Sequence, residues 1–229
     1  MTAPAHPERW LAVVLLSILL GGCLLSEKSQ PITVIAPRIQ IAPSDRPAVT
    51  WSLAIERPRA DALVDSTRIL VRVPPSEIRV MPGAGWIEPV PDLLQSALLQ
   101  GFEDVGRIAA VGRAGSQRSR YRLYTELRRF EAVETGPGLD VEIELHAKLI
   151  LGRSGEIIHA RGFRSTVAAA GDDPPALAAA FQKALGDLLG PVIEWTLDAP
   201  GIDPSHDLDR HRMTEPDPAE AANEDSHTK

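Results

Sequence analysis

Residues 140–151 alternate between polar and apolar side chains, and no other feature of the 229-residue sequence constrains the fold as strongly. Successive side chains of a β-strand point to opposite faces, so the pattern predicts a strand with one buried face and one face in water. A strand of this kind is typical of an antiparallel sheet. Its buried face is expected to consist of Val141, Ile143, Leu145, Ala147, Leu149 and Leu151.

The segments on either side extend this pattern into an antiparallel meander. Residues 121–130 alternate in the same way, and the run Gly136-Pro137-Gly138 then breaks the chain. After the alternating strand, a turn at Arg153-Ser154-Gly155 leads into a third strand that includes residues 157–163. Shorter strands are predicted at residues 51–55, 68–73, 77–81 and 108–111.

Two amphipathic helices complete the expected domain. The first follows Pro89 and Pro91, and its apolar stripe is Leu94, Leu98, Phe102 and Val105. The second starts at Asp172-Asp173-Pro174-Pro175, because a carboxylate caps free backbone N–H groups and proline suits the first turn. Only a sheet is large enough to cover its stripe, so we expect an α+β fold, a mixed or antiparallel sheet with two main helices packed on it. That stripe is Leu177, Phe181, Ala184, Leu188, Val192 and Trp195.

The first 22 residues are predicted to be a lipoprotein signal peptide. The apolar run from Trp10 to Leu20 has eleven residues, about half of the ~20 that a membrane-spanning helix needs. It is followed by Leu20-Gly21-Gly22-Cys23, which resembles a bacterial lipobox and contains the sole cysteine of the chain. We therefore predict Cys23 as the lipidation site, where acyl chains such as palmitate anchor the protein. The alternative is a buried structural cysteine after an uncleaved anchor.

Composition divides the rest of the chain into three parts. Residues 23–48 contain the predicted lipidated cysteine and four prolines, which favour an extended tether, although residues 32–35 could still pair as an edge strand. Residues 49–197 form the predicted domain. Residues 198–229 have nine acidic and three basic side chains and no hydrophobic period, so we expect a disordered acidic tail.

The overall composition excludes several classes of protein. A net charge of −7 has the wrong sign for binding nucleic acid, and aromatic residues make up only 4% of the chain. A single cysteine cannot form an intrachain disulfide or an iron–sulfur cluster. No nucleophile elbow, phosphate loop or zinc-binding motif occurs, so we expect no enzyme, no cofactor and no metal. His146 and His159 on neighbouring predicted strands could form a base or metal site, but a solvated strand face is the favoured interpretation.

A group of arginines lies around the first strand of the meander. It includes Arg129 and the four residues that we single out as candidate partner-binding side chains. Such a group is either a solvated face or a contact for an acidic partner or lipid headgroups. The four candidates are Arg118, Arg120, Arg122 and Arg128.

The order and spacing of several short motifs resemble the family of ABC-type transport auxiliary lipoproteins, which includes paraquat-inducible protein C. The resemblance covers about residues 51–197; the first strand departs from it, with Trp51 where the family is rich in tyrosine, and the acidic tail is an addition. The motifs are Trp86-Ile-Glu-Pro89, Tyr121-Arg122-Leu123 with Phe130-Glu131, the segment from Gly155 to Phe163, and Ala180-Phe181 with Ala184-Leu185 and Trp195.

The resemblance implies an auxiliary component of a lipid transport system of the mammalian-cell-entry type. The implied partners are the transporter permease and ATPase and a periplasmic lipid-binding subunit, with the protein docking them to the outer membrane. Leu24 in place of aspartate after the lipobox cysteine favours the periplasmic face of that membrane. The alternative is an outer-membrane lipoprotein that regulates an envelope enzyme, such as a cell-wall synthase, by binding it. The sequence leaves open whether copies of the chain form a homo-oligomer.

Overall fold

The sheet is organised around one long strand, β6 (Tyr121–Thr135). The computed structural model describes residues 32–116 and 118–199. Within them, β6 pairs antiparallel along its whole length with β7 (Gly138–Leu151), from Tyr121 opposite Leu151 to Thr135 opposite Gly138. β7 pairs antiparallel with β8 (Ile157–Ala168) in turn. The predicted meander is therefore confirmed.

On its other side, β6 has two separate parallel partners. β2 (Leu53–Ile55) pairs with the start of β6 and continues to β5 (Val111–Arg113). β3 (Arg68–Val73) pairs near the end of β6 and continues to β4 (Glu77–Trp86) and then to β1 (Thr33–Ile35). The result is an eight-stranded mixed sheet, as the predicted fold class requires.

A register shift interrupts the pairing of β6 with β7. Leu127 lies opposite Leu145 and Arg129 lies opposite Glu144, so Arg128 is the extra residue of a β-bulge. Because the bulge adds one residue to the two-residue period, Leu127 and Phe130 both reach the buried face, each 2% exposed.

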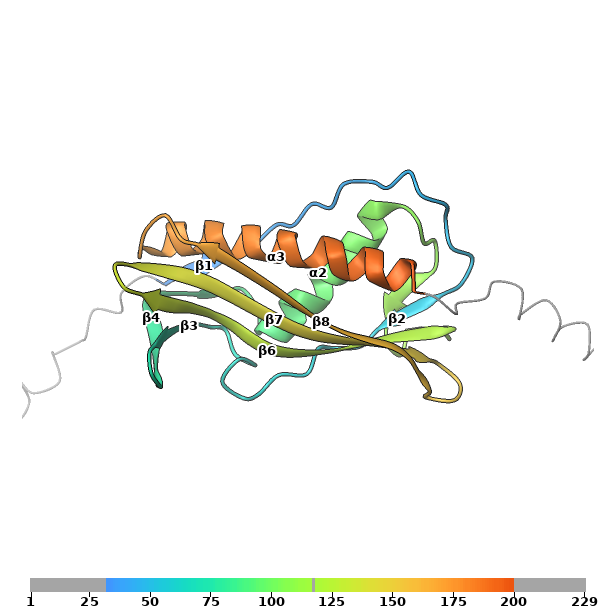
Figure 1. Ribbon diagram of the computed structural model, residues 1–229, viewed down its shortest axis with the longest axis horizontal. Helices are drawn as coiled ribbons and strands as arrows, with labels where there is room; N and C mark the ends of the chain where they lie inside the picture. The colour runs from blue at the N-terminus through green and yellow to red at the C-terminus, as the bar shows by residue number, and fades with distance from the viewer. Residues whose placement is uncertain (1–31, 117, 200–229) are drawn as a thin grey trace, which may run out of the picture. The chain divides into compact units, whose positions relative to one another are not determined.

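Both helices, α2 (Val90–Val105) and α3 (Pro174–Leu197), lie on one side of the sheet (Figure 1). The side chain of Asp173 accepts a hydrogen bond from the Ala176 N–H at 2.8 Å, which is the predicted cap of α3. α2 ends at Gly106, whose φ of 70° favours glycine. By length and composition alone α3 could cross a membrane, but core helices share these properties and its apolar stripe packs on β7 and β8.

An aromatic cluster joins α3 to strands β4 and β6 of the sheet. The ring of Phe181, 0% exposed, stacks on Phe130 with a centroid distance of 4.9 Å. Trp86 at the end of β4 meets Phe181 edge-on, also at 4.9 Å. The rings therefore connect β4, β6 and α3 in the centre of the core.

The packed part of the chain is longer than the predicted domain of residues 49–197. It begins at Thr33 in β1, and Ile39 is only 6% exposed, so residues 33–48 are not a free tether. Ala199, 6% exposed, extends it at the other end. Two strand predictions also shift: the strand at 77–81 continues to Trp86, and the one expected at 108–111 lies at 111–113, because Ile108 forms only an isolated bridge with Val49.

Candidate functional site

The predicted lipidation site, Cys23, lies outside the described residues, and so does the tail from residue 200 onward. Lipidation therefore stays a prediction. The candidate site that the structure can describe is the arginine group around β6.

Three of the four candidate arginines have partners within the domain. Arg122 forms an ion pair with Glu56 and lies over the ring of Tyr124 at 5.2 Å. Arg120 Nε donates a hydrogen bond to the Tyr121 hydroxyl at 3.2 Å. Arg128, at the bulge, donates to Glu126 at 3.2 Å and is 48% exposed. The arginines therefore do not form one uniform basic surface.

Arg118 and Arg122 meet instead at an open pocket of about 280 Å³ beside the start of β6, together with Arg153 from the β7–β8 turn. We call this site the arginine pocket. Sequence reasoning missed Arg153, although the pairing of Tyr121 with Leu151 brings the turn to this end of β6. The pocket is lined by Ala54, Ala114, Gly115, Arg118, Ser119, Arg122, Gly152 and Arg153.

Gly152 holds the turn against the chain that leads into β6. Its N–H donates a hydrogen bond to the Arg120 carbonyl at 2.7 Å. A Cβ atom at position 152 would lie 2.5 Å from the Ser119 carbonyl oxygen, which is too close for any side chain. Glycine thus permits the backbone contact that brings Arg153 to Arg118 and Arg122.

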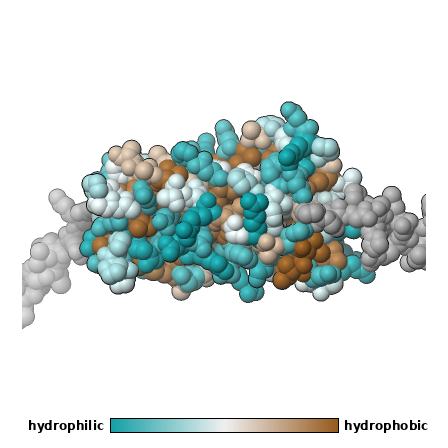
Figure 2. Space-filling view, in the orientation of Figure 1, coloured by the Kyte–Doolittle hydropathy of each residue, from teal (hydrophilic) through white to brown (hydrophobic). Residues whose placement is uncertain are grey.

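The outward face of the meander carries ion pairs between neighbouring strands. Arg129 on β6 donates to Glu142 on β7 at 2.9 Å, and Arg164 on β8 binds Glu144 on β7. The hydrogen bond from Arg164 lowers the pKa of the Glu144 carboxyl. Hydrophilic residues dominate the middle of the view in Figure 2, with smaller hydrophobic areas toward its edges. The face of the meander that carries these ion pairs is the predicted wet face of the alternating strand.

The two histidines of the meander do not form a common site. His146 lies opposite Gly162, whereas His159 lies opposite Leu149, which is 0% exposed and belongs to the buried face. The two positions therefore belong to opposite faces of the sheet. Among residues 32–116 and 118–199, no three potential metal ligands gather.

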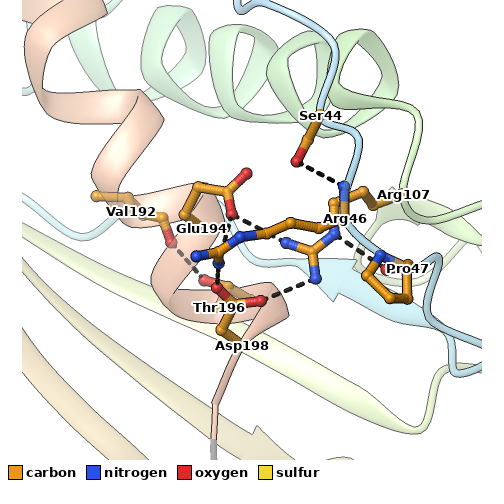
Figure 3. A network of polar contacts seen from close by, with 8 residues as sticks. All are labelled: Ser44, Arg46, Pro47, Arg107, Val192, Glu194, Thr196 and Asp198. Carbon is orange, nitrogen blue, oxygen red and sulfur yellow. Dashed lines mark hydrogen bonds and ion pairs between the residues drawn. The ribbon is translucent and has the colours of Figure 1, made fainter.

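A second arginine site lies at the C-terminal end of α3 (Figure 3), where Arg107 is 5% exposed. Arg107 donates to Glu194 at 2.9 Å, to Asp198 at 2.8 Å and to the Pro47 carbonyl at 3.1 Å. Arg46 pairs with both carboxylates as well. This set, which we call the Arg107 network, ties the segment before β2 to the end of α3. No sequence signal identified it, because its members are far apart in the chain.

Comparison with known proteins identifies relatives of this domain. The family model described as "ABC-type transport auxiliary lipoprotein component" matches residues 33–191, more than half of the chain. The crystal structure of protein XCC0632 from Xanthomonas campestris is similar, with a TM-score of 0.69 and 38% identity, over 72% of this chain and 94% of that one.

Two more distant similarities are informative. An uncharacterized protein of known structure has a TM-score of 0.58 at 10% identity, over 72% of this chain and 97% of that one, which shows a shared fold alone. The uncharacterized protein bll6063 from Bradyrhizobium diazoefficiens is 28% identical over 155 residues, or 64% of this chain. The chain spans only 39% of the length of that relative.

Proposed function

Because the chain belongs to the family of ABC-type transport auxiliary lipoprotein components, we propose that it is a lipid-anchored adaptor of an intermembrane lipid transport system. In this proposal it connects the permease, the ATPase and a periplasmic lipid-binding subunit of the mammalian-cell-entry type to the outer membrane. It does so by binding and not by catalysis. The observation that carries the proposal is the family match over residues 33–191.

The anchor is the first element of this function. Cleavage before Cys23 and acylation of its sulfur would fix the N-terminal end of the chain to a membrane, and Leu24 favours the outer one. The Cys23→Ser variant should remain unprocessed at this site and lack acyl chains, as measured by intact mass. Normal processing and anchoring of this variant would contradict the proposed attachment.

Recovery of partners is the decisive test. The tagged full chain, solubilised from membranes in mild detergent, should bring down the permease, the ATPase and the periplasmic lipid-binding subunit, identified by mass spectrometry. Recovery of a cell-wall synthase in their place would favour the alternative, a lipoprotein that regulates an envelope enzyme.

Arg128 offers a way to locate the contact. It is exposed and its ion pair with Glu126 is on the surface, so Arg128→Glu changes charge without burying it. Arg122 is less suitable, because glutamate there would face Glu56. We expect Arg128→Glu to reduce partner recovery several-fold at low salt and less at high salt, in line with screening. Arg68→Glu, an exposed arginine at the start of β3, is the matched control.

A further inference from the structure

The arginine pocket contains an excess of positive charge that the domain leaves uncompensated. Three arginines line it, and none of the described lining residues is acidic. The whole chain has a net charge of −7, so this local concentration of positive charge is opposite in sign to the charge of the chain. Three guanidinium groups around one cavity repel one another, and an anion between them would remove that repulsion.

Two of the three guanidinium groups have no partner within the part of the chain that the structure describes. Arg122 is occupied by Glu56, but neither Arg118 nor Arg153 makes an ion pair or a side-chain hydrogen bond there. Arginines elsewhere differ: Arg72 binds Glu131 through two hydrogen bonds, at 2.7 and 2.8 Å. The pocket therefore keeps two sets of donors available.

The surrounding backbone leaves room for a small ligand. Ala54, Ala114, Gly115 and Gly152 have short or no side chains, and the small residue Ser119 lines the pocket with them. The three arginines come from two segments, the start of β6 with the chain before it and the β7–β8 turn, which the Gly152–Arg120 hydrogen bond holds together. A volume of about 280 Å³ is near the lower limit of small-molecule pockets, so it fits a compact group better than a long chain.

We propose that the arginine pocket binds the phosphate group of a phosphate ester, with Arg118 and Arg153 as the primary ligands and Arg122 beside them. The planar guanidinium matches phosphate oxygens through paired hydrogen bonds, and two free guanidinium groups match its charge and its several acceptor oxygens. The phosphate could come from a lipid headgroup, which is a diester, or from a soluble monoester. This inference does not depend on the proposed transport partners.

Calorimetric titration of the purified full chain in neutral detergent tests the site. The probes are inorganic phosphate, glycerol phosphate as a monoester, and glycerophosphoglycerol as a water-soluble diester headgroup. We expect saturable binding of at least one probe, weakened about tenfold or more in the variant Arg118→Gln/Arg153→Gln, because each lost charged hydrogen bond weakens binding by roughly this factor. Tightest binding of the diester identifies a lipid headgroup, and tightest binding of a monoester or phosphate identifies a soluble source.

Two further variants separate a site from general charge. Arg59→Gln/Arg68→Gln removes the same charge from exposed arginines outside the pocket and should leave binding unchanged. Arg118→Lys/Arg153→Lys keeps the charge but loses the planar donor pairs, so it should bind more weakly than the native chain.

The proposal fails if no probe binds, if the two glutamine pairs weaken binding equally, or if a polyglutamate peptide binds more tightly than every phosphate probe. The last result would assign the pocket to an acidic protein segment. Because no transporter subunit is present, failure here leaves the proposed adaptor function untouched.

Discussion

The Arg107 network and the arginine pocket both bring together arginines from distant segments, but they differ in the burial of the guanidinium groups and in their pairing with carboxylates. In the network, Arg107 is 5% exposed and binds two carboxylates and a backbone carbonyl. In the pocket, Arg118 and Arg153 are exposed, and no described acidic residue lines the cavity. The number of arginines alone would not distinguish these two regions.

The difference shows how one residue type can serve the fold in one place and binding in another. A buried guanidinium must have its donors satisfied, because an unpaired buried charge is costly. An exposed guanidinium has water as a partner, so it can exchange that water for a ligand. Carboxylates at the network and their absence from the described lining of the pocket thus separate a structural arginine site from a candidate binding site.

Substitution in the aromatic cluster is expected to have the largest effect on the free energy of unfolding, and the effects at the two arginine sites can be compared with it. Phe181→Ala removes a ring that is 0% exposed and stacked on Phe130, so it should lower the free energy of unfolding by about 3–5 kcal/mol. Urea denaturation measures the change. Gln182→Ala, at the next and exposed position of α3, is the control. A loss below about 1 kcal/mol for Phe181→Ala would contradict the packing described here.

Removing the carboxylates of the Arg107 network should have an effect near that scale. Glu194→Ala/Asp198→Ala leaves the guanidinium of Arg107 buried with only the Pro47 carbonyl, and should lower the free energy of unfolding by about 3 kcal/mol. Chemical denaturation at neutral pH measures it. Asp187→Ala, which breaks only an exposed pair with Lys183, should cost less than about 0.5 kcal/mol. Equal losses in the two variants would show that the network is not structural.

Two truncations sharpen the boundary of the network. Removal of residues 200–229 should shift Tm by no more than about two degrees, because that segment has few apolar residues. Removal of 198–229 also deletes Asp198, and with it a charged hydrogen bond to Arg107 worth about 1.5 kcal/mol or more. Differential scanning calorimetry compares them. A large drop in Tm for the shorter deletion would mean that residues beyond 199 stabilise the domain.

The arginine pocket should give the smallest effect on stability. Arg118→Gln/Arg153→Gln should change the free energy of unfolding by less than about 0.5 kcal/mol, because both side chains are exposed and neither has a partner within residues 32–116 and 118–199. A slight gain is expected if the arginines repel one another. The measurement is urea denaturation without phosphate. A loss comparable to that of the network variant would make the pocket a structural site, and the comparison would then fail.

Periodic segments of the sequence determined the main elements of the fold. The alternation over residues 140–151 predicts β7, and the apolar stripe behind Asp173 predicts α3, because strand and helix periods are local properties that packing on one face preserves. The motif order was likewise enough to identify the family, which the match over residues 33–191 confirms. The four candidate arginines around β6 could also be found from the sequence, because they lie within eleven consecutive residues.

Tertiary structure alone decided which distant segments meet. β1 has only three residues; the apolar run at 32–35 allowed an edge strand, but only the pairing with β4 shows that the packed region starts at Thr33. Arg107 precedes Glu194 by 87 residues and Asp198 by 91, and only the packing of α2 and α3 brings them together. Arg153 joins Arg118 because Gly152 allows a backbone contact across the end of the sheet. Such contacts depend on the path of the whole chain, whereas hydrophobic periods depend on a few neighbouring residues.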